Sequence, residues 1–152
     1  MYNKRRILVN IAFFLLPKKE VVTLSTQSTI RQALEKMEYH RYSSVPLINQ
    51  KGEYVGTLAE GDLLWKLKSL EHIELHELEH LRIEEVPRHG DYEAITINDE
   101  MESILSRASE QNFVPVVDDQ NIFIGLVRRR EIIEYCISQL FIHGETPLNV
   151  KI

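Results

Sequence analysis

The chain has 152 residues, of which 18 are Lys or Arg and 23 are Asp or Glu, so its formal net charge is −5. Apolar residues make up 43% of the chain, too many for a disordered protein and enough for a buried core. A single cysteine, Cys136, excludes an internal disulfide and a multi-cysteine metal site. The acidic balance argues against a nucleic-acid-binding protein.

The N-terminus begins with basic residues followed by an apolar run, as a secretory signal does. The run from Ile7 to Leu16 is interrupted by Asn10, and Pro17 follows it in place of a small-residue cleavage site. It is also far shorter than the roughly 20 residues of a membrane-spanning helix. We therefore expect an amphipathic helix that docks on the domain, in a cytoplasmic protein that has no membrane partner.

The first half of the chain predicts the order strand, helix, strand, strand, helix. Apolar residues recur from Ile30 to Met37 at the spacing of one helix face, with Ser28 or Thr29 as the cap. The remaining predicted elements are strands at 21–24, 44–49 and 54–58 and a closing helix at 60–68.

A connector, residues 69–80, follows the first half. His72, His76 and His80 would share one face of a continuous helix, so a metal- or pH-responsive module is one alternative. The simpler interpretation is a solvated face, and we expect no metal site. The opposite side would be buried through Ile73, Leu75, Leu78, Leu81 and Ile83.

The second half repeats the first. Val45-Pro46-Leu47-Ile48 recurs as Val114-Pro115-Val116-Val117, and at the same offset of 69 residues Gly56 and Asp62 recur as Gly125 and Glu131. The predicted elements are strands at 94–97, 113–118 and 122–127, a helix from Met101 capped by Asn98 or Asp99, and a helix at 128–141.

The repeat predicts an α+β fold in which two tandem β-α-β-β-α motifs pack sheet to sheet, because neither could bury its apolar faces alone. We place the first motif with its N-terminal helix at 8–68, the linker at 69–80 and the second motif at 81–141. The tail, 142–152, is interpreted as an irregular end or an exchange arm.

The strand order, the proline in the second strand and the Gly-x-x-x-x-x-acid segment at the exit of the third strand resemble a CBS domain. Two copies resemble a CBS pair, also called a Bateman module. The resemblance implies binding of an adenine nucleotide between the motifs, homodimers, and regulation of a separate partner enzyme. We expect no permanent cofactor and, without a Walker loop or a nucleophile motif, no catalytic residues.

The base and ribose of the ligand are expected at the first motif. Tyr42 could stack on a base, and Ser43 and Ser44, just before Pro46, could bond its edge. Asp62 could accept hydrogen bonds from ribose hydroxyls, or it could be a first-turn acid favoured by the helix dipole.

The phosphate is expected at the second motif. Three arginines, Arg128, Arg129 and Arg130, stand at a predicted helix N-terminus, where the dipole disfavours cations and an anion would relieve the conflict. The alternative is that the arginine stems splay into solvent or pair with acids.

The second motif is shorter than the first, because Ala108 lies seven residues before Pro115 whereas Met37 lies nine residues before Pro46. This shortening, the Arg129-Arg130 pair and the Tyr42 segment resemble small stand-alone CBS proteins that bind cyclic di-AMP. That resemblance adds Val22 on the first strand and Glu20 just before it, although the subgroup can carry a lysine at the position of Glu20. AMP, ADP and ATP stay alternative ligands, and an interaction scaffold with a degenerate ligand site is an alternative function.

Overall fold

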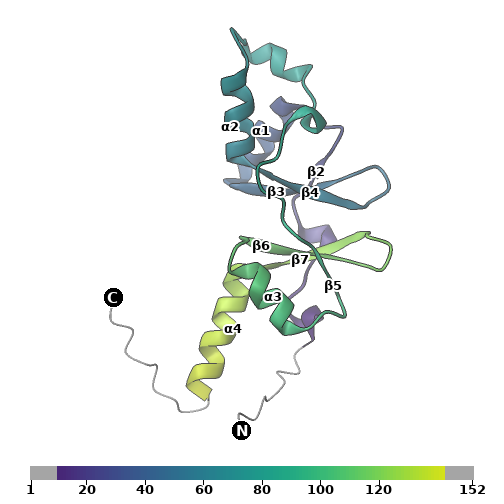
Figure 1. The fold of residues 1–152 in the computed structure, drawn as a ribbon, viewed down its shortest axis with the longest axis vertical. Helices are drawn as coiled ribbons and strands as arrows, with labels where there is room; N and C mark the ends of the chain where they lie inside the picture. Colours follow the sequence, from purple (N-terminus) through teal and green to yellow (C-terminus); the bar gives the residue numbers. More distant parts are fainter. Residues whose placement is uncertain (1–9, 143–152) are drawn as a thin grey trace, which may run out of the picture.

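The computed structural model describes residues 10–142 and has an α+β fold (Figure 1). Its strands are β1 (Leu16–Pro17), β2 (Leu24–Ser25), β3 (Ser44–Ile48), β4 (Tyr54–Ala59), β5 (Ile95–Thr96), β6 (Phe113–Val117) and β7 (Phe123–Arg128). Its α-helices are α1 (Ile30–His40), α2 (Glu60–Ser69), α3 (Met101–Ala108) and α4 (Arg129–Ile142). Short 3₁₀ helices are η1 (Ile11–Phe13), η2 (Lys18–Glu20), η3 (Leu75–Glu79) and η4 (Ile83–Glu85). The prediction of an α+β fold with two similar motifs is confirmed.

The two halves lie one above the other, with a sheet of each facing the junction and the α-helices on the outside (Figure 1). The first sheet has the strand order β2-β3-β4, and the second has the order β1-β7-β6-β5. In each half a short parallel strand pairs with one arm of an antiparallel hairpin. This is the sheet-to-sheet packing that the repeat predicts.

Helix α1 begins as predicted, whereas α3 does not. The Thr29 side chain and Gln32 form a reciprocal capping box at the start of α1. Glu100 precedes α3 without a side-chain cap, and the Asp99 carboxylate instead accepts the Thr96 N–H at 2.8 Å. The prediction that Asn98 or Asp99 caps this helix is therefore wrong, because Asp99 closes the preceding turn.

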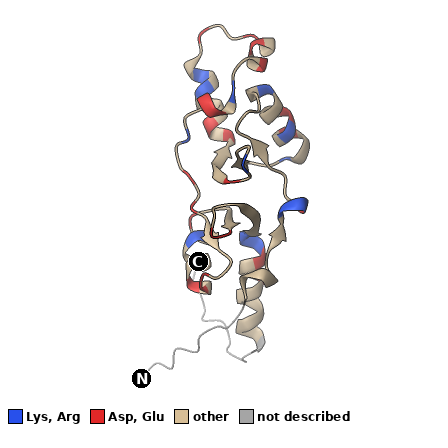
Figure 2. Ribbon diagram, turned by 90° about the vertical axis from the view of Figure 1, so that its right-hand side faces the viewer, with Lys and Arg blue, Asp and Glu red and all other residues tan. Residues whose placement is uncertain are grey.

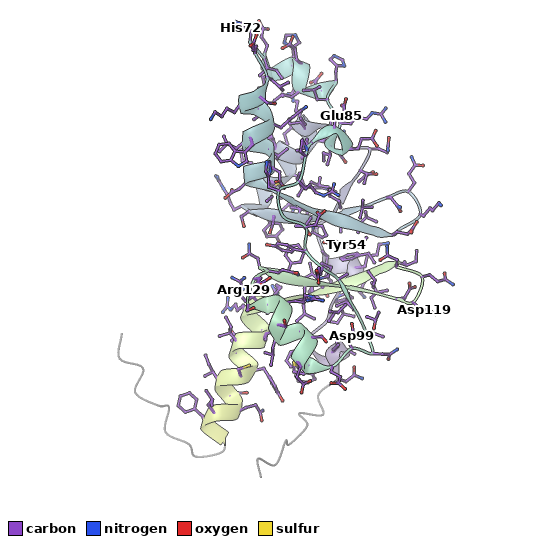
Figure 3. The ribbon with its side chains drawn as sticks, in the orientation of Figure 1. Tyr54, His72, Glu85, Asp99, Asp119 and Arg129 are labelled. Atoms are coloured by element: carbon purple, nitrogen blue, oxygen red, sulfur yellow. The ribbon has the colours of Figure 1, made fainter. Side chains whose placement is uncertain are left out.

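An apolar cluster joins the two sheets. Ile48 and Tyr54 of the first hairpin pack with Val117 and Phe123 of the second. The turns of the hairpins also exchange backbone bonds, since the Phe123 N–H donates to the Gly52 carbonyl at 2.9 Å and the Tyr54 N–H donates to Asn121 at 3.2 Å. Tyr54 lies at this junction in Figure 3.

The N-terminal segment forms a strand where the sequence predicts an amphipathic helix. Within its described part there is only the single turn η1, after which β1 pairs antiparallel with β7 and places Pro17 opposite Gly125. Ile11 and Phe14 are buried in the core of the second half. The helix prediction is wrong from residue 10 onward, because the proline-ended segment gains more by completing a sheet; residues 8 and 9 lie outside the described residues.

The connector and the residues directly after it complete the core of the first half. Leu78 of the connector and Ile83 and Val86 after it are buried there, and the Ile83 N–H donates to the Ser28 carbonyl at 2.9 Å. Leu75, expected on the buried side, is 67% exposed. The expected packing of the connector is therefore confirmed in part.

The three connector histidines do not share a helix face. His72 has a left-handed backbone (φ 50°) and lies at the far end of the first half (Figure 3), and η3 covers only residues 75–79. No group of three metal-ligating side chains occurs among residues 10–142, and no helix in that range is long and apolar enough to cross a membrane. The predicted tail from residue 143 onward lies outside the described residues.

Candidate functional site

A cavity of about 410 Å³ opens at the junction of the two halves. Its volume lies within the range of small-ligand pockets. It is lined by the segment before β2, by the turn from α1 into β3, and by the start of α4. Nine of the ten predicted ligand residues line it: Glu20, Val22, Tyr42, Ser43, Ser44, Pro46, Arg128, Arg129 and Arg130.

The basic wall of the cavity lies where β7 passes into α4. Figure 2 shows basic residues at the end of α4 that faces the junction, and Figure 3 places Arg129 there. Glu131 accepts a hydrogen bond from Arg128 at 2.8 Å, which raises the pKa of that guanidinium, and Glu134 accepts one from Arg130 at 2.9 Å. Two of the three arginines thus pair with acids of α4, as the alternative interpretation expects.

Arg129 has a different environment. Its Nε donates to the Ala108 and Gln111 carbonyls at 2.8 and 2.9 Å, at the C-terminal end of α3. The negative end of that helix favours a cation, which offsets the unfavourable field at the start of α4. Arg129 is therefore held in place at the cavity wall by backbone groups, with no carboxylate paired to it among the described residues.

The opposite wall is the tight turn after α1. Arg41 caps this helix in the left-handed conformation (φ 57°), and its N–H donates to the Glu38 carbonyl. The turn directs the next residues into the cavity. The Tyr42 ring is about half exposed and stacks on His40, with a centroid separation of 5.3 Å and an interplanar angle of 13°. An exposed aromatic face beside two serines can accept a flat heterocycle and bond its edge.

Asp62 does not join this cavity, contrary to the prediction that it shares a site with Tyr42. Its side chain is only 4% exposed, and its carboxylate accepts hydrogen bonds from the Ala59 N–H, the His89 N–H and the His89 ring, all at 3.0–3.1 Å. The physical reason is that α2 starts beside the segment that enters the second motif. The alternative interpretation, an acid in the first turn of α2, agrees with the bond from the Ala59 N–H, because Ala59 directly precedes this helix.

The cavity has wall residues that the sequence did not single out. These are Leu16, Val21, Arg41, Asn112, Phe113 and Leu126. Arg41 directly precedes Tyr42 in the sequence, so its place beside a predicted ligand residue could have identified it as a wall residue. Asn112 and Phe113 belong to the second motif and enter the first motif's pocket only because the two motifs face each other.

Two β-α-β-β-α motifs thus face each other across a cavity of ligand size. The model of the CBS domain family matches residues 14–69 and 83–138, so the chain belongs to the CBS domain family and carries two such domains. The resemblance inferred from the sequence is confirmed.

Solved structures share this fold. Over 91% of each chain, the protein is similar to CbpB in complex with c-di-AMP (24% identity, TM-score 0.77). It is similar to Listeria monocytogenes CbpB in complex with c-di-AMP over 86% of this chain and 97% of that one (22% identity, TM-score 0.74). Similarity to CBSX2 in complex with AMP covers the same shares (17% identity, TM-score 0.65). No curated protein sequence matches the chain.

Proposed function

We propose that this protein is a regulatory module that binds an adenine nucleotide in the cavity between Tyr42 and Arg129. The observation that carries the proposal is the assembly of nine predicted ligand residues around one cavity at the junction of the two CBS domains. CbpB structures that contain c-di-AMP, and a CBSX2 structure that contains AMP, support this class of ligand. We favour cyclic di-AMP, with AMP, ADP and ATP as the alternatives.

In this proposal the base lies against Tyr42, between apolar contacts from Val22 and Pro46, and its edge bonds to Ser43 and Ser44. The phosphates lie toward the start of α4, where the helix dipole and the arginine guanidinium groups both favour an anion. A ligand with two phosphates gains from more than one arginine, which is why we place cyclic di-AMP first.

Calorimetric titration of the protein with cyclic di-AMP, AMP, ADP and ATP tests the proposal. Replacing Arg129 and Arg130 together by alanine removes two charges from the phosphate side, so we expect at least tenfold weaker binding. The matched control is Arg31→Ala, because Arg31 pairs with Glu35 on α1 and lies outside the cavity. Circular dichroism verifies that the double variant folds.

A thermal-stability screen with the same nucleotides gives a second readout. A ligand present at 100 times its dissociation constant adds about 2.7 kcal/mol to the free energy of unfolding. A protein that shows neither heat of binding nor a stability shift with any of them is not a nucleotide sensor. The interaction scaffold with a degenerate site would then be the better description.

We further propose that a second copy of the chain covers the exposed apolar side of α4. Ile133, Ile137, Leu140 and Phe141 recur there at helical spacing and are all exposed. On the equivalent helix of the first half, α2, Leu64 and Trp65 are exposed as well. Apolar residues grouped on two outer helices are typical of an interface.

The expected homodimer is tested by light scattering after size exclusion. Ile137→Glu places a charge in the centre of the apolar side of α4, and we expect a monomer with an unchanged circular dichroism spectrum. Lys51→Glu, on an exposed hairpin turn, is the control and stays dimeric. A dimeric Ile137→Glu variant would contradict this interface.

Regulation would act by population shift. A nucleotide that binds one arrangement of the module better than another favours that arrangement and changes which surface a separate partner protein can contact. Pull-down of proteins from a lysate on the immobilised protein, with and without cyclic di-AMP, measures this effect, and equal recovery of a bound protein in both conditions would contradict it.

A further inference from the structure

The two motifs repeat each other, so the position of the nucleotide cavity has a counterpart on the other side of the junction. Strand pairing places Ser44 opposite Ala59 in the first sheet and Phe113 opposite Arg128 in the second. Each cleft combines strand starts of one motif with the third-strand exit of the other. The counterpart of the nucleotide cavity therefore lies between residues 91–93 and 111–113 on one side and residues 59–62 on the other.

The side chain of Tyr92 occupies this second cleft. Its ring packs edge to face on Phe113 with centroids 4.9 Å apart, and its hydroxyl accepts the Asn112 N–H at 3.2 Å. Phe113 and Asn112 are the counterparts of Ser44 and Ser43, the residues proposed to bind the base in the first cavity. An aromatic ring of the protein itself thus takes the place equivalent to that of the base.

Two buried polar side chains fix this segment. Asp62 accepts bonds from the main chain and the ring of His89, as described above. Gln111, 6% exposed, accepts the Glu93 N–H at 2.9 Å and donates to the Glu93 carbonyl at 3.2 Å. Gln111 is the counterpart of Tyr42. In the second motif this position bonds the main chain of Glu93, whereas in the first motif it presents an aromatic ring to the cavity.

The two clefts differ in their charged side chains, since among the described residues Glu20 is the one carboxylate that lines the first. The first is lined by Arg41 and the three arginines before and within α4. The second has Asp62 on one side and Asp91 and Glu93 on the other, with Asp91 paired to Arg88 at 2.7 Å and Glu93 to Arg107 at 2.6 Å. Carboxylates on both walls disfavour a phosphate ligand.

We infer that residues 88–93 are a built-in plug that closes the second cleft, so that the chain binds one nucleotide and not two. The count of one rests on the proposed function of the first cavity. The closure rests only on the contacts of Tyr92, Asp62 and Gln111, and it is tested without a nucleotide.

Hydrogen exchange of the nucleotide-free protein tests the closure. We expect the amides of His89 and Glu93, which donate to Asp62 and Gln111, to exchange at least tenfold more slowly than in an unfolded peptide. Gln111→Ala should accelerate exchange at Glu93, whereas Gln120→Ala on an exposed turn should leave it unchanged. Unprotected amides at His89 and Glu93 in the wild-type protein would overturn the inference.

Calorimetric stoichiometry with cyclic di-AMP, and separately with AMP, tests the count. We expect one equivalent per chain, lost in the Arg129→Ala plus Arg130→Ala variant. Two equivalents per chain would overturn the inference. Protected amides in a protein that binds neither nucleotide would leave the plug in place and refute the proposed function instead.

Discussion

Tyr54 is a buried polar residue at the point where the two halves meet. Its hydroxyl lies 2.8 Å from the Thr57 hydroxyl and donates to the Tyr92 carbonyl at 2.9 Å. Burial raises the pKa of this phenol above its ordinary value of 10.0, because the charged form would be desolvated. The same side chain therefore ties the first sheet to the plug segment and favours the neutral phenol.

The raised pKa of Tyr54 predicts a loss of stability in alkaline solution. A group whose pKa is higher in the folded state stabilises the fold below its unfolded pKa, and this contribution disappears as the pH rises through the folded pKa. We expect the unfolding midpoint to fall above about pH 10, and to fall less steeply in Tyr54→Phe. At neutral pH that variant should lose about 1 kcal/mol with its hydrogen bonds. Parallel midpoint curves from pH 7 to 11 would contradict the prediction.

Asp62 is a buried acid whose position follows from a sequence motif but whose partner does not. The glycine-to-acid spacing predicted either a ribose contact or a first-turn acid at this position, and Asp62 is one of the few buried polar residues in the described range. Its partner, His89, lies 27 residues away in a segment without a recognisable motif. Only the tertiary structure therefore distinguishes a ribose contact of Asp62 from a structural contact with His89.

At the scale of elements, the matched glycines Gly56 and Gly125 have different surroundings. A methyl group at Gly125 would lie 2.2 Å from the main-chain oxygen of Leu16, because β1 passes directly over β7. At Gly56 the nearest atoms, 2.6 and 2.8 Å away, belong to the flexible side chains of Asp91 and Arg88. The two glycines are equivalent in the sequence repeat, but only Gly125 lies against β1.

Gly125→Ala should therefore destabilise the protein more than Gly56→Ala. We expect a loss of about 1–3 kcal/mol at Gly125, where a backbone strand must move, and a smaller loss at Gly56, where side chains can turn away. Urea denaturation followed by circular dichroism measures both. Equal losses would show that the contact between β1 and β7 does not matter for stability.

The elements within each motif followed from local patterns. Apolar spacing at 3.6 residues, a cap at Ser28 or Thr29 and apolar strands around polar turns are properties of neighbouring residues, so α1, α2, α4 and the two hairpins were predicted to within a few residues. The N-terminal segment was not, because its strand exists only by pairing with β7, more than 100 residues later in the chain.

At the scale of the whole molecule, the two halves complete each other. Residues 11–17 of the N-terminus belong to the sheet and core of the second half, while the connector fills the core of the first. Phe123, 1% exposed, packs on Tyr54 between the sheets. Such crossing segments and a shared cluster couple the folding of the two halves.

Phe123→Ala should therefore weaken both halves together. We expect a loss of about 3–5 kcal/mol and a single cooperative transition at lower denaturant concentration. Phe13→Ala is the control, because Phe13 is 79% exposed and its truncation should change stability by less than about 0.5 kcal/mol. Two separate transitions in the Phe123 variant would show that the halves fold independently.

The sequence by itself determined the repeat, the α+β class, the CBS family and nine of the fifteen residues that line the cavity, because each depends on spacing along a short stretch of chain. The tertiary structure alone decided that Asp62 serves the second cleft, that Tyr92 fills this cleft, and that two of the three arginines pair with carboxylates of α4. The reason is that the two motifs face each other, so each cleft is built from residues of both motifs. A sequence pattern within one motif carries no information about which residues of the other motif will lie opposite it.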